Sequence, residues 1–254
     1  MFRPRIIPVL LLKNLGLVKS IKFNKYRYIG DPINAVKLFN DLKADELVFL
    51  DILASSQTRT ISLDFVRKVG DEANMPFAVG GGIRSIKHIR DILISGAEKV
   101  VINTYAHENP DFIRQAANEF GCSTIVVSID VRKKMIGKKK VFVLGGTKDT
   151  KRDPVEFAQL MFDNGAGELI INSIDHDGLM NGYDLELVNA ISSSVTIPVV
   201  AIGGAGSMED LRNVCKGAHA NAAAAGSIFV YHGPRRAVLI NYPSQTELKS
   251  LFEN

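Results

Sequence analysis

The two halves of this sequence repeat one another at a spacing of 122 residues. The matches recur along each half and include a pair of adjacent glycines. The matched positions are Asp31-Pro32 and Asp153-Pro154, Ala44 and Ala166, Glu46-Leu47 and Glu168-Leu169, Gly81-Gly82 and Gly203-Gly204, Ser85 and Ser207, and Arg90 and Arg212. Self-similarity at a fixed period indicates a repeated structural unit. We therefore expect a fold made of two copies of one half.

Short apolar runs alternate with longer amphipathic stretches along the chain. The runs are Arg5–Leu12, Glu46–Ile52, Phe77–Val79, Lys99–Asn103, Thr124–Asp130, Leu169–Asn172, Pro198–Ala201 and Ala222–Ala225. Continuous apolarity is typical of parallel strands that are covered on both faces. Eight such strands with intervening helices predict an α/β fold, a single (β/α)8 TIM barrel made of two duplicated half-barrels. We expect residues 1–254 to form this one domain.

The composition limits the possible partners. A net charge of +4, from 31 basic and 27 acidic residues, is too small an excess to indicate nucleic-acid binding, although it suits small anionic substrates. Cys122 and Cys215 form neither a disulfide framework nor a metal-binding spacing. The N-terminal apolar run is too short to span a membrane. We expect a cytoplasmic protein without a metal, a cofactor, a nucleic-acid partner or a membrane contact.

Glycine-rich turns follow corresponding strands in the two halves. Such turns let the backbone approach a ligand, and the helix that follows offers unpaired N–H groups to a phosphate. Polar residues follow the next strand in each half, and an aspartate and a glycine follow the sixth strand. The predicted phosphate-binding residues are Gly81, Gly82, Asn103, Thr104, Asp177, Gly178, Gly203, Gly204, Gly226 and Ser227. Two such sets imply an elongated ligand with a phosphate at each end.

Two further aspartates end predicted strands, where the reacting groups of such barrels lie. Asp130 follows an apolar run, which favours a raised pKa and a role as general acid or base. It could instead cap a helix or pair with a lysine. Asp51 ends the second strand and is a second catalytic candidate, with the alternative that it orients its neighbours.

A long segment, Lys13–Gly30, follows the first strand and carries Lys19, Lys22, Lys25 and Arg27. Long loops in compact domains often act as lids. We expect a mobile basic flap over an anionic substrate, with Lys19 as its catalytic residue. A solvated basic surface is the alternative for the other three side chains.

Charged residues also stand at the starts of four strands, at the opposite end of the predicted barrel. They are Arg5, Glu46, Lys99 and Glu168. Two bases and two acids can alternate in a ring around the barrel axis. Such a ring could close the bottom of the barrel or gate a passage through it.

Together these features resemble, over essentially the whole chain, the cyclase subunit of imidazole glycerol phosphate synthase. The segments that carry the resemblance are residues 5–8, 30–32, 45–51, 79–83, 175–178, 182–184 and 203–206. The resemblance implies a glutaminase subunit docked on the bottom of the barrel in a heterodimer, ammonia passing through the barrel, and a substrate phosphorylated at both ends. It also implies that the four-charge ring is the ammonia gate.

The chain departs from the family pattern at the end of the first strand. Family members carry a catalytic aspartate there, paired across the barrel with the one that matches Asp130, whereas this chain has Leu11. At four other positions near the mouth the family usually has a polar residue, whereas this chain has an apolar one. They are Val143, Leu144, Leu179 and Ile202. Loss of one proton-transferring group typically lowers a rate by about 10²- to 10⁴-fold, so the cyclase reaction is in doubt.

These observations favour a diverged paralogue that receives ammonia from a glutaminase partner. Similar paralogues accompany surface-sugar amidotransferases, so the resemblance extends to amidine formation and to a third, amidotransferase protein. One alternative is an authentic cyclase of histidine biosynthesis. Another is a non-catalytic glutaminase activator that conducts ammonia to another protein. A barrel isomerase of the same pathway fits less well, because it too relies on an aspartate in the first strand.

Overall fold

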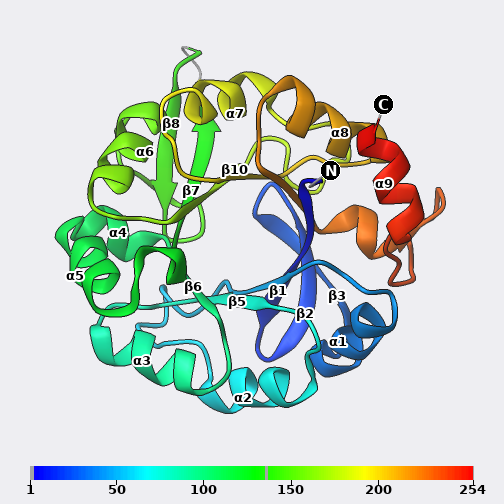
Figure 1. Ribbon diagram of the computed structural model, residues 1–254, viewed down its shortest axis with the longest axis horizontal. Coiled ribbons are helices and arrows are strands. Elements are labelled where there is room, and N and C mark those ends of the chain that lie inside the picture. The colour runs from blue at the N-terminus through cyan, green and yellow to red at the C-terminus, as the bar shows by residue number, and fades with distance from the viewer. Residues whose placement is uncertain (1–2, 135–136, 254) are drawn as a thin grey trace.

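Parallel strands close into a barrel inside a ring of helices (Figure 1). The computed structural model describes residues 3–134 and 137–253, and within them eight strands form the barrel. These are β1 (Arg5–Lys13), β4 (Leu47–Asp51), β5 (Phe77–Gly80), β6 (Lys99–Ile102), β7 (Ile125–Lys133), β10 (Glu168–Ser173), β11 (Val199–Ile202) and β12 (Ala222–Ala225). The pairing of β7 with β10 and of β12 with β1 closes the barrel. The predicted (β/α)8 fold is confirmed.

The helices pack around the outside of the barrel. They are α1 (Pro32–Asp41), α2 (Leu63–Glu72), α3 (Ile86–Ile94), α4 (Thr104–Glu108), α5 (Asp111–Phe120), α6 (Pro154–Asp163), α7 (Leu185–Ser192), α8 (Met208–Gly217) and α9 (Gln245–Glu253), with short 3-10 turns at η1 (Cys122–Thr124) and η2 (Ser227–Phe229). Their apolar faces and the outward-facing strand residues form one large core. In the described chain, every helix is too short or too polar to cross a membrane.

The sequence repeat corresponds to matched helix starts in the two halves. Asp31 caps α1 by accepting a hydrogen bond from a backbone N–H, Asp153 caps α6 in the same way, and a proline follows each of them. Ser85 and Ser207 cap α3 and α8. A capping side chain satisfies one of the N–H groups that a helix start leaves unpaired. The repeated residues therefore fix where equivalent helices begin.

Each half also extends its first strand into an antiparallel hairpin. The strands β2 (Gly16–Ile21) and β3 (Asn24–Gly30) follow β1, whereas β8 (Lys139–Val143) and β9 (Lys148–Asp149) follow β7. A short pair, β13 (Tyr231–His232) and β14 (Ala237–Val238), follows η2. The predicted basic flap is therefore the β2–β3 hairpin. It exposes Lys22, Lys25 and Arg27 but buries Lys19.

The interior of the barrel holds its own apolar cluster, separate from the outer core. Its members are Ile7, Val9, Val48, Ala78, Val101, Val126, Ile170, Val200, Ile202, Ala222 and Ala224, with Leu11 and Leu50 packed against it. Alternate residues of a strand point to the same face, which is why these positions are two apart along each strand. The cluster separates the charged ring at one end of the barrel from a cavity at the other.

Candidate functional site

A cavity opens at the carboxyl ends of the barrel strands and collects the predicted site residues. Its lining includes all of the predicted catalytic and phosphate-binding residues, and also Leu11, Ser20, Asn172 and Leu144. They come from both halves and from the β2–β3 hairpin. The barrel topology explains this, because parallel strands all end at the same face.

Asp130 lies at the polar side of the cavity and is 8% exposed. Burial raises its pKa to about 7, the negative charge of Asp177 acts in the same direction, and hydrogen bonds from Asn172 and Asn103 oppose the rise. The Nδ2 of Asn103 lies 3.1 Å from the Asp130 carboxylate. A carboxyl group with a pKa near neutrality can both accept and donate a proton under physiological conditions.

Lys19 extends from β2 into the cavity and is 5% exposed. Its Nζ donates a hydrogen bond of 2.7 Å to the backbone oxygen of Val9. Burial lowers the pKa of Lys19 to about 8, while the carboxylate of Asp177 partly opposes that decrease. The Nζ also packs against Gly226, where an added Cβ would lie 2.3 Å away. Gly226 therefore makes room for the lysine.

Asp177 lines the cavity, and its carboxylate is engaged within the protein. Its negative charge acts on both Lys19 and Asp130, and its carboxylate accepts a hydrogen bond of 2.7 Å from Ser20. Burial raises its pKa, which Ser20, the backbone N–H of Phe23 and Lys19 oppose. Its backbone oxygen also accepts from Lys22 N at 3.0 Å. Asp177 therefore fastens the β2–β3 hairpin over the cavity, while its role in phosphate binding stays a prediction.

Asp51 is engaged by an arginine. Its carboxylate accepts from Arg59 Nη1 at 2.5 Å and from Arg59 Nη2 at 3.1 Å, and also from the backbone N–H of Leu53 at 3.1 Å. A bidentate pair of this kind holds both oxygens in place. This geometry favours the alternative reading of Asp51, in which it orients the loop after β4.

Strand register confirms that Leu11 is the structural counterpart of Asp130. Leu11 pairs with Leu50 on β4, and Asp130 pairs with Asn172 on β10, which is the residue that matches Leu50 in the repeat. Both Leu11 and Asp130 line the cavity. Asp51 pairs with Leu12 and its carboxylate is held by Arg59, so it does not occupy the position of Leu11.

The inward-facing residues near the carboxyl ends of the strands are polar on one side of the barrel and apolar on the other. The neighbouring strands β7 and β10 carry Asp130 and Asn172, and Asn103 follows β6, whereas β11, β1 and β4 contribute Ile202, Leu11 and Leu50. We did not predict Asn172 as a site residue. The sequence signal was its place at the end of the apolar run Leu169–Asn172. In the structure Asn172 is 7% exposed and pairs with Asp130. Its Oδ1 is buried without a hydrogen-bond partner in the described chain, so a ligand could donate to it.

The paired glycines form matched turns in the two halves. Gly81 and Gly82 have φ values of 140° and 65°, and Gly203 and Gly204 have values of 94° and 115°. These values lie in the left-handed half of φ space, which glycine adopts most easily. The second glycine of each pair also packs against a neighbouring loop, so that an added Cβ would lie 1.8 Å from the Arg59 oxygen and 2.1 Å from the Gly182 oxygen respectively.

Substituting Gly82 should therefore destabilise the protein more than a left-handed backbone alone explains. We expect Gly82→Ala to cost about 1–2 kcal/mol for its backbone conformation and about 1–3 kcal/mol more for the steric overlap. Gly121→Ala is the matched control, because Gly121 has a φ of 83° and open space around its Cβ position. Urea unfolding would measure both. Equal losses for the two variants would contradict the packing argument.

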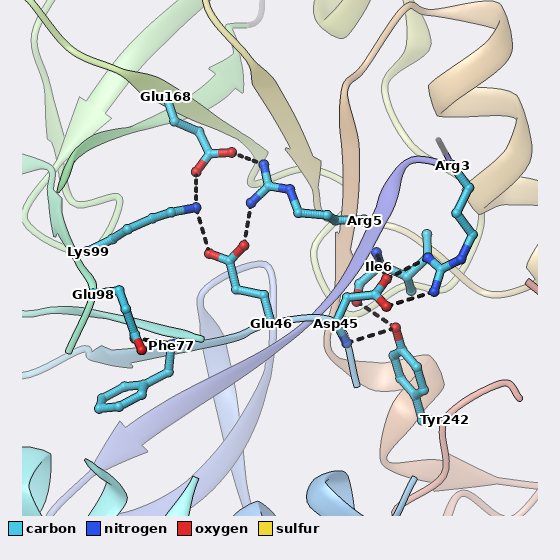
Figure 2. A network of polar contacts seen from close by, with 10 residues as sticks. All are labelled: Arg3, Arg5, Ile6, Asp45, Glu46, Phe77, Glu98, Lys99, Glu168 and Tyr242. Atoms are coloured by element: carbon cyan, nitrogen blue, oxygen red, sulfur yellow. Dashed lines mark hydrogen bonds and ion pairs between the residues drawn. The ribbon is translucent and has the colours of Figure 1, made fainter. Parts of the chain in front are cut away.

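The four charged residues at the strand starts form a closed ring at the other end of the barrel (Figure 2). Arg5 donates to both Glu46 and Glu168, and Lys99 Nζ lies 3.0 Å from Glu46 and 2.9 Å from Glu168. Burial lowers the pKa of Arg5, but the two glutamates outweigh that effect and raise it overall. The alternation that we expected from the sequence is present, and the ring closes this end of the barrel interior.

Known proteins are similar to this chain in sequence over most of its length. The family described as "Histidine biosynthesis protein" matches residues 5–234. A Pseudomonas aeruginosa protein with the provisional name imidazole glycerol phosphate synthase subunit hisF2 is 47% identical, over 98% of this chain and 99% of its own. A provisionally named hisF3 subunit of Vibrio vulnificus is 43% identical, over 100% and 98% respectively. The imidazole glycerol phosphate synthase subunit HisF of Lactococcus lactis subsp. cremoris is 46% identical, over 91% and 90%. The chain therefore belongs to the histidine biosynthesis protein family, among the HisF-like subunits of imidazole glycerol phosphate synthase.

Proposed function

We propose that this chain is the ammonia-receiving barrel subunit of a glutamine-dependent complex, in a heterodimer with a glutaminase subunit. The observation that carries the proposal is the closed ring of Arg5, Glu46, Lys99 and Glu168 at one end of an apolar barrel interior that leads to the cavity. Neutral ammonia is a small molecule that an apolar interior can pass once such a ring opens. The glutaminase would dock around the ring.

We infer that the substrate is elongated and carries a phosphate at each end. The support is the pair of matched glycine turns, each followed by a helix, on opposite sides of one mouth. Backbone N–H groups at helix starts attract phosphate. Thr104 and Ser227, which follow the next strand in each half, add hydroxyl groups to the two places.

We further infer that the chain has diverged from the cyclase reaction and serves surface-sugar amidine formation, with an amidotransferase as a third protein. Leu11 supports the divergence, because it removes one of two carboxylates that would face one another across the cavity. The provisional names of the Pseudomonas and Vibrio relatives, which carry the numbers 2 and 3, suit an additional gene copy. The free thiols of Cys122 and Cys215 suit the cytoplasm.

Authentic cyclase activity in histidine biosynthesis is the second candidate. Its support is the retention of Asp130, Lys19 and both glycine turns, together with the printed name of the Lactococcus relative. A non-catalytic glutaminase activator that conducts ammonia is the third candidate, which Leu11 favours, because an incomplete catalytic pair does not prevent conduction.

Reconstitution with glutamine labelled with 15N at its amide would test these candidates. We expect the label to enter an acceptor only when this chain, its glutaminase and the amidotransferase are all present, with imidazole glycerol phosphate remaining unlabelled. Label in imidazole glycerol phosphate would instead support the histidine-pathway role. Faster glutamine hydrolysis, with all label released as free ammonia in every mixture, would contradict nitrogen transfer.

A further inference from the structure

We propose that Lys19 is the second proton-transfer group of this cavity, a general acid that acts opposite Asp130 in place of the carboxylate that Leu11 replaces. The proposal deepens the proposed function, since it concerns how ammonia is added to the acceptor. It depends on three observations: where the ammonium group lies, what surrounds it, and which proton each group holds near neutral pH.

The position of Lys19 sets its nitrogen on the far side of the cavity from Asp130. Its Nζ donates a hydrogen bond to the backbone oxygen of Val9 on β1 and packs against Gly226, which follows β12. Asp130 lies on β7, and in the strand order β7 is four strands from β1 in either direction around the barrel. A ligand in the cavity therefore lies between the two groups.

The surroundings of Lys19 contain little negative charge in the described part of the chain. The neighbouring cavity residues of β1 and β12 are Val9, Leu11 and Ala225, which are apolar, and the hydrogen-bond acceptor of its Nζ is a neutral carbonyl. Asp177 attracts the ammonium group, although its carboxylate already accepts hydrogen bonds from Ser20 and Phe23 N. Leucine at position 11 thus keeps this face of β1 uncharged.

This environment makes Lys19 an acid of useful strength. A buried ammonium group without a close counter-charge loses its proton more readily than one in water. The pKa of Lys19 falls to about 8 and that of Asp130 rises to about 7. At a pH between these two pKa values, Asp130 is mostly a carboxylate and Lys19 is mostly an ammonium group. The cavity therefore holds a base and an acid on opposite sides at the same pH.

Addition of ammonia to a carbonyl carbon uses both groups. The nitrogen lone pair forms the new C–N bond while the C=O π bond breaks toward oxygen. The Asp130 carboxylate takes one N–H proton, and the Lys19 ammonium gives one proton to the oxygen, so the total number of protons in the site is unchanged. Exchange with solvent returns both groups to their starting forms. An aspartate at position 11 would hold the Lys19 proton more tightly and weaken this acid.

Direct titration of Lys19 tests the proposal without any substrate. The full chain would be labelled with [13Cε]lysine, its NMR signals followed from pH 6 to 11, and the Lys19 signal identified by its loss in Lys19→Met. We expect a midpoint near 8 in the natural protein and in Leu11→Asn, which keeps position 11 uncharged. In Leu11→Asp the midpoint should be higher by about one pH unit or more.

The outcomes distinguish this proposal from the proposed function. A natural midpoint close to 10.5, the ordinary value for lysine, would overturn the acid role even if Leu11→Asp failed to fold. An unchanged midpoint in folded Leu11→Asp would overturn the link with position 11. Because the titration involves neither glutamine nor an acceptor, it gives its answer whether or not the reconstituted complex transfers nitrogen.

Discussion

Leu11→Asp should raise the rate of ammonia-dependent imidazole glycerol phosphate formation by about 10²-fold or more. The substitution returns a carboxylate to the position that faces Asp130 across the cavity, in matching strand register. The proposed divergence from the cyclase reaction rests on the absence of this second carboxylate, so restoring it should restore the rate. The measurement is the steady-state rate with saturating ammonium salt and no glutaminase, so that neither the ring nor a partner limits the reaction.

Leu11→Asn is the control for this gain, because it changes shape and polarity without adding a carboxylate. A similar gain in Leu11→Asn would assign the effect to space or polarity instead of proton transfer. Natural protein that already turns over at the rate of Leu11→Asp would mean that leucine is tolerated, and the histidine-pathway assignment would then stand. Ile202 and Leu144, which also line the cavity, set an upper limit on the gain.

The sequence predicted the barrel because its repeat and its apolar runs reflect backbone geometry directly. A strand covered on both faces must be apolar throughout, and a helix start needs its capping residue, so Asp31 and Asp153 marked equivalent helices. The ring at the bottom was predictable for a related reason. Arg5, Glu46, Lys99 and Glu168 each stand at a strand start, where a shared barrel end brings them together.

The chemistry of individual side chains was less predictable, since it depends on contacts between residues far apart in sequence. Lys19 was singled out within the basic flap, but the sequence did not show that the β2–β3 hairpin buries it. Asp177 was predicted only as part of a phosphate site, and the hydrogen bond that its carboxylate accepts from Ser20, 157 positions away, could not be inferred from the sequence. Asp51 and Asp130 both end apolar runs of the sequence, and only their partners distinguish them, since Arg59 pairs with the former.

Asp130→Asn should make the protein more stable at pH 8 by about 2–4 kcal/mol, while it removes the cavity's base. The pKa of Asp130 is raised from 3.8 to about 7 in the folded state. Between these values the folded protein keeps a proton that the unfolded chain has released, so stability falls as pH rises through this window. The loss of stability caused by the buried Asp130 carboxylate is fully present above pH 7. Asparagine carries no charge and avoids it.

Urea unfolding at pH 4.5 and at pH 8 would measure this effect, with Asp51→Asn as the control. The advantage of Asp130→Asn should be small at pH 4.5 and large at pH 8. Asp51→Asn should instead destabilise the protein at pH 8, because it breaks the ion pair with Arg59. Asp130→Asn with no gain at pH 8 would contradict the raised pKa. A gain would mean that the fold tolerates a destabilising carboxylate at this position, as expected for a group kept for catalysis.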